Sequence, residues 1–287
     1  MNFDFSEEQV MLRDSVARFV QDDYDFDTRR SIAASEAGIS REFWQTFAEL
    51  GWLSIPFAEE HGGFGGGAVD VMVVMEQLGR GLVLEPYLET VLLFGGLLQQ
   101  GGSDAQQSEY IPAIIDGSCL GAFAYLERQS RYELADVVTT ASADGDGYRL
   151  NGEKVVVFNG ANADHFIVSA RTSGDQCAEQ GISLFLVPAN APGLETLAYS
   201  LMDGRRVVNL VLNNVEVPAG NLVGELDGGY PLIESVVMQS ILALGAEAVG
   251  IMGELNAKTV EYTRTREQFG VSIGSFQALQ HRMVDTF

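Results

Sequence analysis

Basic residues and cysteines are scarce in this sequence. Lys and Arg number 17 in 287 residues, against 40 Asp and Glu, which gives a formal net charge of −23. Nucleic acids and anionic membrane surfaces are bound through clustered Lys and Arg, so neither is an expected partner. An anionic ligand must be held by local donors against an unfavourable long-range field. With only two cysteines, Cys119 and Cys177, a disulfide framework is impossible, and we expect a cytoplasmic protein.

Signals for targeting, membrane insertion and metal binding are also missing. Asp4, Glu7 and Glu8 give the N-terminus a charge pattern unlike that of a signal peptide. The apolar stretches 91–98 and 236–245 are shorter than a membrane span, so we expect no membrane insertion. The three histidines are not paired with cysteines at ligand spacing, which argues against a structural zinc site.

The first third of the chain has helical patterning. Ser6 followed by Gln9 predicts a capped helix start, and Ser40 caps a second candidate helix. The glycine-rich run 62–67 indicates a loop. Two apolar helices are expected after this loop, at 69–78 and 87–99.

From about residue 120 the pattern changes to short segments rich in β-branched and aromatic residues. These segments are 148–150, 154–158, 165–170, 182–187 and 207–217. Turn sequences at 144–147, 151–152, 159–160 and 190–193 separate them, and their Asn-Gly pairs are typical of hairpins. Since no helix of about 10–15 residues lies between the strands, we expect an antiparallel sheet in barrel or sandwich form.

Helical patterning returns near the end of the chain. The apolar segment 232–252 predicts a long helix, and 254–267 either continues it or follows it closely. After a break at Gly270, a last helix is expected from Ser275 to Phe287. This final part provides roughly two helices, whereas a bundle usually has about four. We therefore expect either a truncated chain or a second chain that completes the bundle.

These patterns together predict an α+β fold in three parts. Residues 1–117 form an N-terminal helical domain, residues 118–228 a middle β domain, and residues 229–287 the start of a C-terminal helical bundle. No proline-rich linker or internal repeat interrupts this order.

Several common catalytic motifs are not found. The glycine run 62–67 has no preceding strand and no following Lys-Ser or Lys-Thr pair, so we interpret it as a structural turn rather than a phosphate-binding loop. No Gly-x-Gly-x-x-Gly opens a helix after a strand, which argues against a Rossmann site. His61, His165 and His281 lie near no Gly-x-Ser-x-Gly motif or activated cysteine, and we interpret them as structural or solvent-exposed.

The most specific segment is 262–273, which reads Tyr-Thr-Arg-Thr-Arg-Glu-Gln-Phe-Gly-Val-Ser-Ile and is followed by Phe276, Gln277 and Gln280. It resembles the acyl-CoA dehydrogenase signature, Tyr-x-x-x-Arg-x-Gln-Phe-Gly-x-x-Ile with a later Phe-Gln-x-x-Gln. Further matches follow the family's order along the whole chain. They are the runs 3–9, 50–52, 59–63, 76–80, 150–154 and 159–160.

The runs 127–132 and 246–250 most resemble those of the small subunits of pimeloyl-CoA and steroid-side-chain CoA dehydrogenases. The resemblance implies an acyl-CoA dehydrogenase-like fold: an N-terminal helical domain, a β domain and a C-terminal four-helix bundle. FAD then lies between the β domain and the bundle, and its adenosine end reaches a neighbouring subunit. The implied reaction is α,β-dehydrogenation of an acyl-CoA thioester, in which a carboxylate removes the α-proton and flavin N5 takes the β-hydride.

The resemblance also assigns residues to the cofactor. Arg266 and Gln268 match the donors that hold the FAD pyrophosphate, and Phe269, Phe276 and Gln277 match the adjoining wall. A guanidinium suits a diphosphate because its planar fork forms paired, charge-assisted hydrogen bonds. The alternative for Arg266 is an exposed ion pair at a helix end.

The segments that would face the flavin ring match the family less well. Tyr125, Leu126, Val157 and Phe158 take the cofactor-binding positions, and Tyr132 stands where a serine serves cofactor and substrate. Leu126 and Phe158 replace residues whose hydroxyls bond the flavin in the family. The loss of two hydroxyls and the added phenyl ring argue against an isoalloxazine site in this chain.

The sequence does not identify the catalytic base. In most members it lies beyond the position of Phe287, and in a minority it takes the place of Ser240, which is assigned here to the substrate side. Glu247 lies two helical turns after Ser240, between apolar residues, where burial would raise the pKa of a carboxylate. Glu247 is thus a candidate base, and the alternative is a paired carboxylate at a helix or subunit contact.

The function expected from these residues is that of a FAD-dependent acyl-CoA dehydrogenase, with an electron-transfer flavoprotein as electron acceptor. We favour the small subunit of a heteromeric enzyme, which lends its Arg266 region to FAD held by a larger catalytic subunit. Two alternatives stay open. The chain is either a truncated member of a tetramer-like homo-oligomer, or a catalytically silent scaffold subunit.

Overall fold

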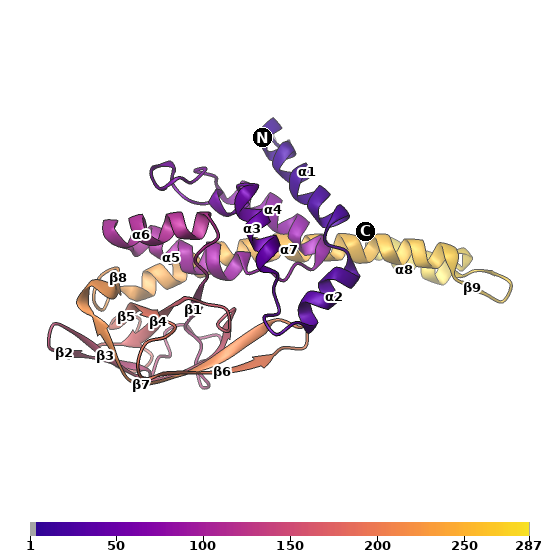
Figure 1. Ribbon diagram of the computed structural model, residues 1–287. Coiled ribbons are helices and arrows are strands. Elements are labelled where there is room, and N and C mark those ends of the chain that lie inside the picture. Colours follow the sequence, from indigo (N-terminus) through magenta and orange to yellow (C-terminus); the bar gives the residue numbers. More distant parts are fainter. Residues whose placement is uncertain (1–3, 287) are drawn as a thin grey trace. The chain divides into compact units, whose positions relative to one another are not determined.

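The computed structural model describes residues 4–286, so Phe3 of the opening run and the terminal Phe287 lie outside the described residues. The chain forms two compact units (Figure 1). Unit 1 comprises the residues up to Arg29, Met72–Val83 and the residues from Ala243 onward, and unit 2 comprises Arg30–Val71 and Leu84–Leu242. Helices α2 (Phe26–Ala34), α4 (Ala68–Gly81) and α7 (Gly229–Thr265) contribute residues to both units.

Unit 1 is mainly helical. Helix α1 (Glu7–Asp22) begins at Ser6, whose hydroxyl accepts a hydrogen bond from the Gln9 amide while the Gln9 side chain accepts one from the Ser6 amide. This confirms the predicted capping box. Helix α7 runs unbroken to Thr265, so the predicted segment 254–267 does continue the helix before it. The last helix, α8 (Gln277–Asp285), begins two residues later than expected.

Within unit 1, α4 and α7 approach each other closely at two glycines. A Cβ atom on Gly79 would overlap the backbone carbonyl of Glu247, and a Cβ atom on Gly250 would overlap that of Glu76. Because glycine has no side chain, the two helix backbones can contact each other directly at these positions.

Besides α4, seven helical segments lie between α1 and the sheet. They are α2 (Phe26–Ala34), α3 (Arg41–Glu49), η1 (Trp52–Ser54), η2 (Glu59–His61), η3 (Tyr87–Phe94), α5 (Gly95–Gly101) and α6 (Asp104–Ile115). Ser40 caps α3 by accepting a hydrogen bond from the Phe43 amide, as predicted. The π-helix η3 and α5 together fill the predicted helix at 87–99. Neither α2, which buries none of its side chains, nor α6, which contains Pro112, was expected.

The middle of the chain forms an eight-stranded sheet in the order β6-β7-β3-β2-β4-β5-β8, with β1 on β4. Its strands are β1 (Gly121–Ala124), β2 (Thr140–Asp144), β3 (Gly147–Phe158), β4 (His165–Arg171), β5 (Ile182–Pro188), β6 (Leu194–Ser200), β7 (Arg206–Pro218) and β8 (Leu222–Val223). The turn expected at 144–147 closes the β2–β3 hairpin, where Asp144 pairs with Gly147. β-branched and aromatic residues supply half of the buried residues in the core cluster of this sheet, and Ala and Leu supply the rest.

The sheet is mostly antiparallel, as expected, with a parallel exception. β1 runs parallel to β4, and Thr140 of β2 pairs in parallel with Arg171 of β4. The chain crosses from β1 to β4 through the β2–β3 hairpin, so parallel pairing needs no intervening helix here. The turn expected at 151–152 was wrong, because β3 continues through Asn151 and Gly152 as an irregularity in its pairing with β7. Gly152 has a φ of 150°, a conformation that favours glycine.

The apolar stretch 236–245 was expected to be shorter than a membrane span, but it is part of a longer helix. It lies inside the 37-residue helix α7, which is long and apolar enough, by length and composition, to cross a membrane. Ile233, Val236 and Ala243 on this helix have exposed fractions of 3% or less, so one side of it is buried against the protein. Met238, Ile241 and Leu242 are 53–65% exposed, so the apolar part of this helix is buried only in part.

Candidate functional site

The signature segment of unit 1 forms a tight hairpin after α7. Strand β9 (Glu267–Gln268) pairs with β10 (Val271–Ser272), and Phe269 and Gly270 form the turn with φ angles of 55° and 80°. Positive φ at both turn residues matches the twist of a two-residue hairpin. A bulky aromatic residue rarely adopts this conformation, so Phe269 is held at the tip by the hairpin geometry.

Arg266 stands at the base of this hairpin with an exposed side chain. Its backbone is fixed at both ends, because its amide donates to Tyr262 O and its carbonyl accepts from Ile273 N, each at 2.8 Å. Its side chain is exposed and forms no ion pair or hydrogen bond within residues 4–286, so the alternative of a helix-end ion pair is absent there. The fork of Arg266 is therefore available to an external anion.

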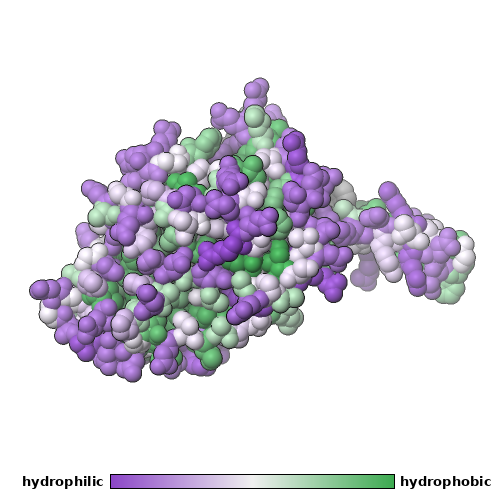
Figure 2. All heavy atoms as spheres, viewed as in Figure 1, coloured by the Kyte–Doolittle hydropathy of each residue, from purple (hydrophilic) through white to green (hydrophobic). Residues whose placement is uncertain are grey.

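The other candidate residues of unit 1 surround the same hairpin. Phe269 is 93% exposed and Phe276 is 38% exposed, and their rings meet edge to face with centroids 6.4 Å apart. Gln268 donates to the Glu267 carbonyl, and Gln277 begins α8 with an exposed side chain. In Figure 2 the tip that Figure 1 labels β9 ends in white and green residues. An exposed aromatic tip beside a cation has the character of a binding surface rather than of a core.

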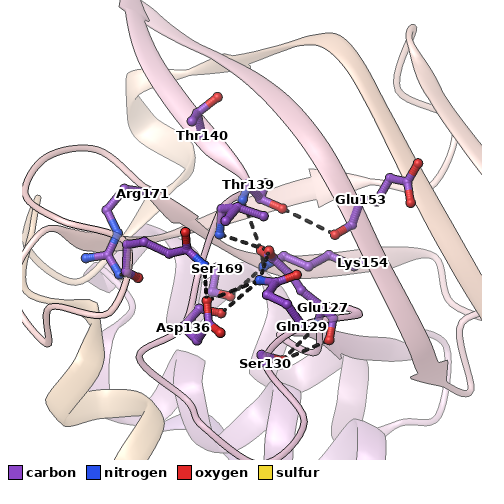
Figure 3. A network of polar contacts seen from close by, with 12 residues as sticks. Glu127, Gln129, Ser130, Asp136, Thr139, Thr140, Glu153, Lys154, Ser169 and Arg171 are labelled. Atoms are coloured by element: carbon purple, nitrogen blue, oxygen red, sulfur yellow. Dashed lines mark hydrogen bonds and ion pairs between the residues drawn. The ribbon is translucent and has the colours of Figure 1, made fainter.

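In unit 2 the loop after β1 is fixed by a buried ion pair (Figure 3). Nζ of Lys154 on β3 lies 2.7 Å from Oε1 of Glu127 and donates to Ser169 Oγ at 3.0 Å. The side chains of Lys154 and Glu127 are 0% and 1% exposed. The amides of Val138 and Thr139 donate to the same carboxylate at 2.9 and 3.1 Å. The pair is thus surrounded by hydrogen-bond partners, as buried charges require.

Both members of the pair are charged at neutral pH. Burial raises the pKa of Glu127, but the Lys154 ammonium and the hydrogen bonds from Lys154, Gln129 and Val138 outweigh it, so this pKa lies below its ordinary value. Burial lowers the pKa of Lys154 to about 8, and the Glu127 carboxylate opposes that shift. The geometry therefore fits a structural ion pair that anchors the loop.

Backbone contacts attach the same loop to β3. Val155 N donates to Leu126 O at 2.8 Å, next to the Glu127–Lys154 pair. Ser130 Oγ accepts from Glu127 N and donates to Glu127 O, both at 3.0 Å. The structure thereby brings the candidate segments 125–126 and 157–158 onto neighbouring strands and loops of one unit.

A strained bulge lies where these segments meet. Val155 and Val156 occupy a shift in the register between β3 and β7, beside Asn209. Val156 has a φ of 52°, which is a rare conformation for a β-branched residue. Its amide donates to Asn209 Oδ1 at 3.1 Å, and the Tyr199 hydroxyl donates to the same oxygen at 3.0 Å. These bonds hold the bend that orients the end of β3.

The four candidate flavin positions in unit 2 offer aromatic and aliphatic side chains. Val157 is buried and Phe158 is half-buried, and burial raises the pKa of Tyr125. Leu126 and Phe158 carry no hydrogen-bonding side-chain group, so only backbone groups could bond a flavin ring at these two positions. Tyr132, assigned to the substrate side, is 97% exposed and follows Arg131, whose φ is 48°.

The two candidates on α7 are both buried. Ser240 is 4% exposed, and its hydroxyl has no hydrogen-bond partner among the described residues. Glu247 is 9% exposed and lies where α7 contacts α4 in unit 1. Their seven-residue spacing places them on the buried side of the helix, as the sequence predicted.

A groove of unit 2 lies at the β2–β3 hairpin and the neighbouring end of β7. It has a volume of about 690 Å³ and carries the carboxylates of Asp144, Asp146 and Glu216. Arg149 forms ion pairs with Asp144 and Glu216. Its lining also includes Tyr148, Pro192 and Val217, so polar and apolar side chains both face this groove.

The histidines contribute no chemistry that the site needs. His61 Nε2 lies 3.0 Å from Gln107 Oε1, and the ring of His165 meets that of Tyr110 edge-on, with centroids 5.0 Å apart. Burial lowers the pKa of His165, so its imidazole is neutral. Within residues 4–286 no group of three or more His, Cys, Asp and Glu side chains could hold a metal ion.

Glu127 and Lys154 were singled out in separate runs of the sequence, but their pairing was not predicted. They are 27 positions apart, and no local spacing relates a loop residue to a residue on β3. The signal that could have suggested the pair is Lys154 itself, a single cation inside an otherwise apolar strand pattern.

Comparison with protein families gives three consecutive matches. The acyl-CoA dehydrogenase N-terminal domain matches residues 6–118, the middle domain residues 122–215 and the C-terminal domain residues 227–286. A mitochondrial isovaleryl-CoA dehydrogenase from Pongo abelii is 33% identical over 98% of this chain and 68% of its own length. These matches confirm the family resemblance stated from the sequence.

Solved structures show the same fold. The ChsE4-ChsE5 complex from Mycobacterium tuberculosis contains a chain with 31% identity and a TM-score of 0.88, covering 99% of this chain and 74% of that one. The FAD complex of PigA has 28% identity and a TM-score of 0.91, covering 100% of this chain and 76% of that one. The α+β fold of helical segment, sheet and helical segment is thereby confirmed.

Proposed function

Because the chain belongs to the acyl-CoA dehydrogenase family of oxidoreductases, we propose that it is a subunit of a FAD-dependent enzyme acting on an acyl-CoA thioester. We propose further that it contributes the Arg266 hairpin to the FAD pyrophosphate, while a larger related subunit holds the flavin ring. FAD, when bound, supplies the acceptor for the β-hydride of the substrate.

The observation that carries this proposal is the free guanidinium of Arg266. In a chain with a net charge of −23, this cation is exposed and has no carboxylate partner within residues 4–286. Its backbone is nevertheless held by two hydrogen bonds of 2.8 Å at the base of the hairpin. A fixed cation without an internal partner fits a diphosphate, which needs local donors in an acidic protein.

The side chains at the flavin-ring positions support the proposal that another subunit holds the flavin ring. Leu126 and Phe158 present no hydroxyl, and Phe158 adds a ring where a small side chain would leave space. Similarity to a chain of the ChsE4-ChsE5 complex supports a heteromeric assembly for this protein too. On this proposal the hairpin residues Gln268, Phe269, Phe276 and Gln277 line the adenosine side of the cofactor.

The remaining parts of the proposal follow from the reaction class. An electron-transfer flavoprotein is the proposed acceptor of the electrons, and a cytoplasmic location fits the scarcity of cysteine. Tyr132 and Ser240 remain proposed contacts of the substrate side. Glu247 remains the candidate base, although its burial at a contact between helices equally fits a paired carboxylate.

A second candidate function is a catalytically silent scaffold subunit. It is favoured by Ser240, which stands at a position where some relatives of the family carry their base and cannot itself act as a carboxylate base. On this alternative the Arg266 hairpin contacts protein rather than FAD.

Flavin absorbance separates the two functions. The chain is co-expressed with a candidate larger subunit from the same family, and the purified complex is compared with each subunit alone. We expect FAD in the complex at one equivalent per site and loss of most of it when Arg266→Ala is introduced. A complex whose FAD content is the same with and without this chain would support the scaffold and contradict the proposal.

A further inference from the structure

The loop after β1 contains a tight turn whose two central residues are Arg131 and Tyr132. The Glu133 amide donates to the Ser130 carbonyl at 2.8 Å, which is the hydrogen bond of a four-residue β-turn. Arg131 has a φ of 48°, a left-handed conformation that is rare for residues other than glycine. The turn therefore presents an arginine and a tyrosine as neighbours on a strained backbone.

Hydrogen bonds on the N-terminal side of this turn fix it to the rest of the loop (Figure 3). Ser130 N donates to Glu127 O at 3.2 Å, and Ser130 Oγ accepts from Glu127 N at 3.0 Å. The Gln129 side-chain amide donates to the carboxylates of Glu127 and Asp136 at 3.0 and 3.3 Å. Because Glu127 is itself held by Lys154, the turn is ordered before a ligand arrives, and this lowers the conformational cost of binding.

The two central side chains of the turn are exposed and have no partners. Tyr132 is 97% exposed, and neither it nor the exposed Arg131 forms a side-chain hydrogen bond, an ion pair or a ring contact among residues 4–286. The adjacent carboxylate of Glu133 accepts a hydrogen bond from the Ala135 amide at 3.3 Å. Since this carboxylate is engaged within the loop, the Arg131 guanidinium is open to an external anion.

An arginine beside an exposed tyrosine suits a ligand that carries both a phosphate and an aromatic ring. A guanidinium forms paired, charge-assisted hydrogen bonds with phosphate oxygens. An exposed aromatic side chain offers a face on which a nucleobase stacks. In a chain with 17 basic residues and a net charge of −23, an anionic ligand depends on such local donors. Adenine nucleotides combine the two groups in one small molecule.

We propose that the turn 130–133 binds the adenosine diphosphate group of a coenzyme, with Arg131 on a phosphate and Tyr132 stacked on the adenine. This inference rests on the proposed function, which involves two coenzymes with that group, the CoA of the substrate and FAD. The FAD diphosphate is already assigned to the Arg266 hairpin, so we expect CoA to be the ligand of the turn. Tyr132 then contacts the nucleotide end of the substrate rather than its acyl end.

Calorimetric titration of the full chain, alone and co-expressed with the larger subunit, tests the inference. ADP probes the shared group, and CoA and FAD show which coenzyme supplies it. Arg131→Gln removes the charge and should weaken ADP binding about tenfold or more. Tyr132→Ala should weaken it by about five- to hundredfold, whereas Tyr132→Phe keeps the ring and should bind like the wild type.

An exposed arginine elsewhere provides the matched control. Arg18→Gln on α1 removes the same charge from the chain and should leave ADP affinity unchanged. A loss of affinity for CoA but not for FAD in the turn variants identifies the substrate as the ligand, and the reverse identifies the cofactor. No ADP binding by the wild type, or an ADP affinity that neither Arg131→Gln nor Tyr132→Ala lowers more than Arg18→Gln does, would overturn the inference.

Flavin absorbance of the wild-type complex reports the proposed function separately. A complex that holds FAD but does not bind ADP through this turn contradicts the inference alone. A complex whose FAD content is the same with and without this chain contradicts the proposed function, whatever the turn binds.

Discussion

Lys154 Nζ lies 2.7 Å from Glu127 Oε1, and both side chains are almost completely excluded from solvent. One residue belongs to β3 and the other to the loop after β1, so this contact joins two segments that the sequence separates by 27 positions. The hydrogen bond from Val155 N to Leu126 O lies next to this ion pair and also attaches the loop to β3. The loop conformation therefore depends on a buried charge pair as well as on the turn around Ser130.

Breaking this pair should be strongly destabilising. Glu127→Gln leaves the Lys154 ammonium without its counter-ion in a buried site, and we expect a loss of about 3–5 kcal/mol in the free energy of unfolding. Urea unfolding followed by circular dichroism measures the loss. Arg128→Ala is the matched control, because Arg128 and Glu153 are paired on the surface at 3.6 Å with side chains 74% and 58% exposed. A control effect as large as that of Glu127→Gln would contradict the assignment.

The pair also predicts a pH dependence. The pKa of Glu127 lies below its ordinary value of 4.5, so the folded chain holds this proton less tightly than the unfolded chain. The stability that Glu127 contributes is present above about pH 4.5 and is lost as the pH falls through the folded-state pKa. Unfolding free energies measured between pH 7 and pH 3 should therefore converge for the wild type and Glu127→Gln at low pH. A constant difference across this range would refute the linkage.

The close approach of α4 and α7 predicts opposite effects for glycine substitutions on one helix. Gly250→Ala adds a methyl group that overlaps the Glu76 carbonyl and should destabilise unit 1 by about 1–3 kcal/mol. Gly245→Ala, five residues earlier on α7, meets no atom within 4 Å and should instead stabilise the helix by up to about 1 kcal/mol. Thermal unfolding of the two variants should move in opposite directions. Similar shifts for both would show that the backbones do not meet at Gly250.

Catalysis by this chain alone should be weak. Ser240 cannot serve as a carboxylate base, and loss of a general base typically lowers rates by about 10²–10⁴-fold. The purified chain is assayed with added FAD and an artificial electron acceptor on several acyl-CoA thioesters. Turnover comparable to that of the co-expressed complex would contradict the small-subunit proposal. If Glu247 were the base after all, Glu247→Gln would abolish that turnover.

Local sequence signals identified the elements that are stabilised by contacts between residues close together in the sequence. The capping box at Ser6 and Gln9, the cap at Ser40 and the hairpin turn at 144–147 depend on short-range hydrogen bonds, and each is present. Helix α2 escaped notice because it buries no side chain and so has no apolar stripe. Helix α6 escaped notice because Pro112 interrupts its pattern.

Features that depend on contacts between residues far apart in the sequence could not be predicted from local sequence signals. Asn151-Gly152 has the composition of a turn, yet pairing with β7 keeps it inside β3 as a bulge. The parallel pairing of β1 with β4 joins residues 44 positions apart, and the Glu127–Lys154 pair joins residues 27 positions apart. The candidate cofactor residues came from a motif, and the structure adds that Arg266 has no partner within residues 4–286.

The central claim is that Arg266 binds the FAD pyrophosphate while the flavin ring is held elsewhere. The most direct measurement is FAD affinity by fluorescence titration of co-expressed complexes carrying Arg266→Ala, Arg266→Lys or Phe158→Thr. We predict that Arg266→Ala removes about 1.5–3 kcal/mol, or roughly ten- to hundredfold in affinity, that Arg266→Lys restores part of it, and that Phe158→Thr changes little. Unchanged affinity in Arg266→Ala, or a large effect of Phe158→Thr, would contradict the claim.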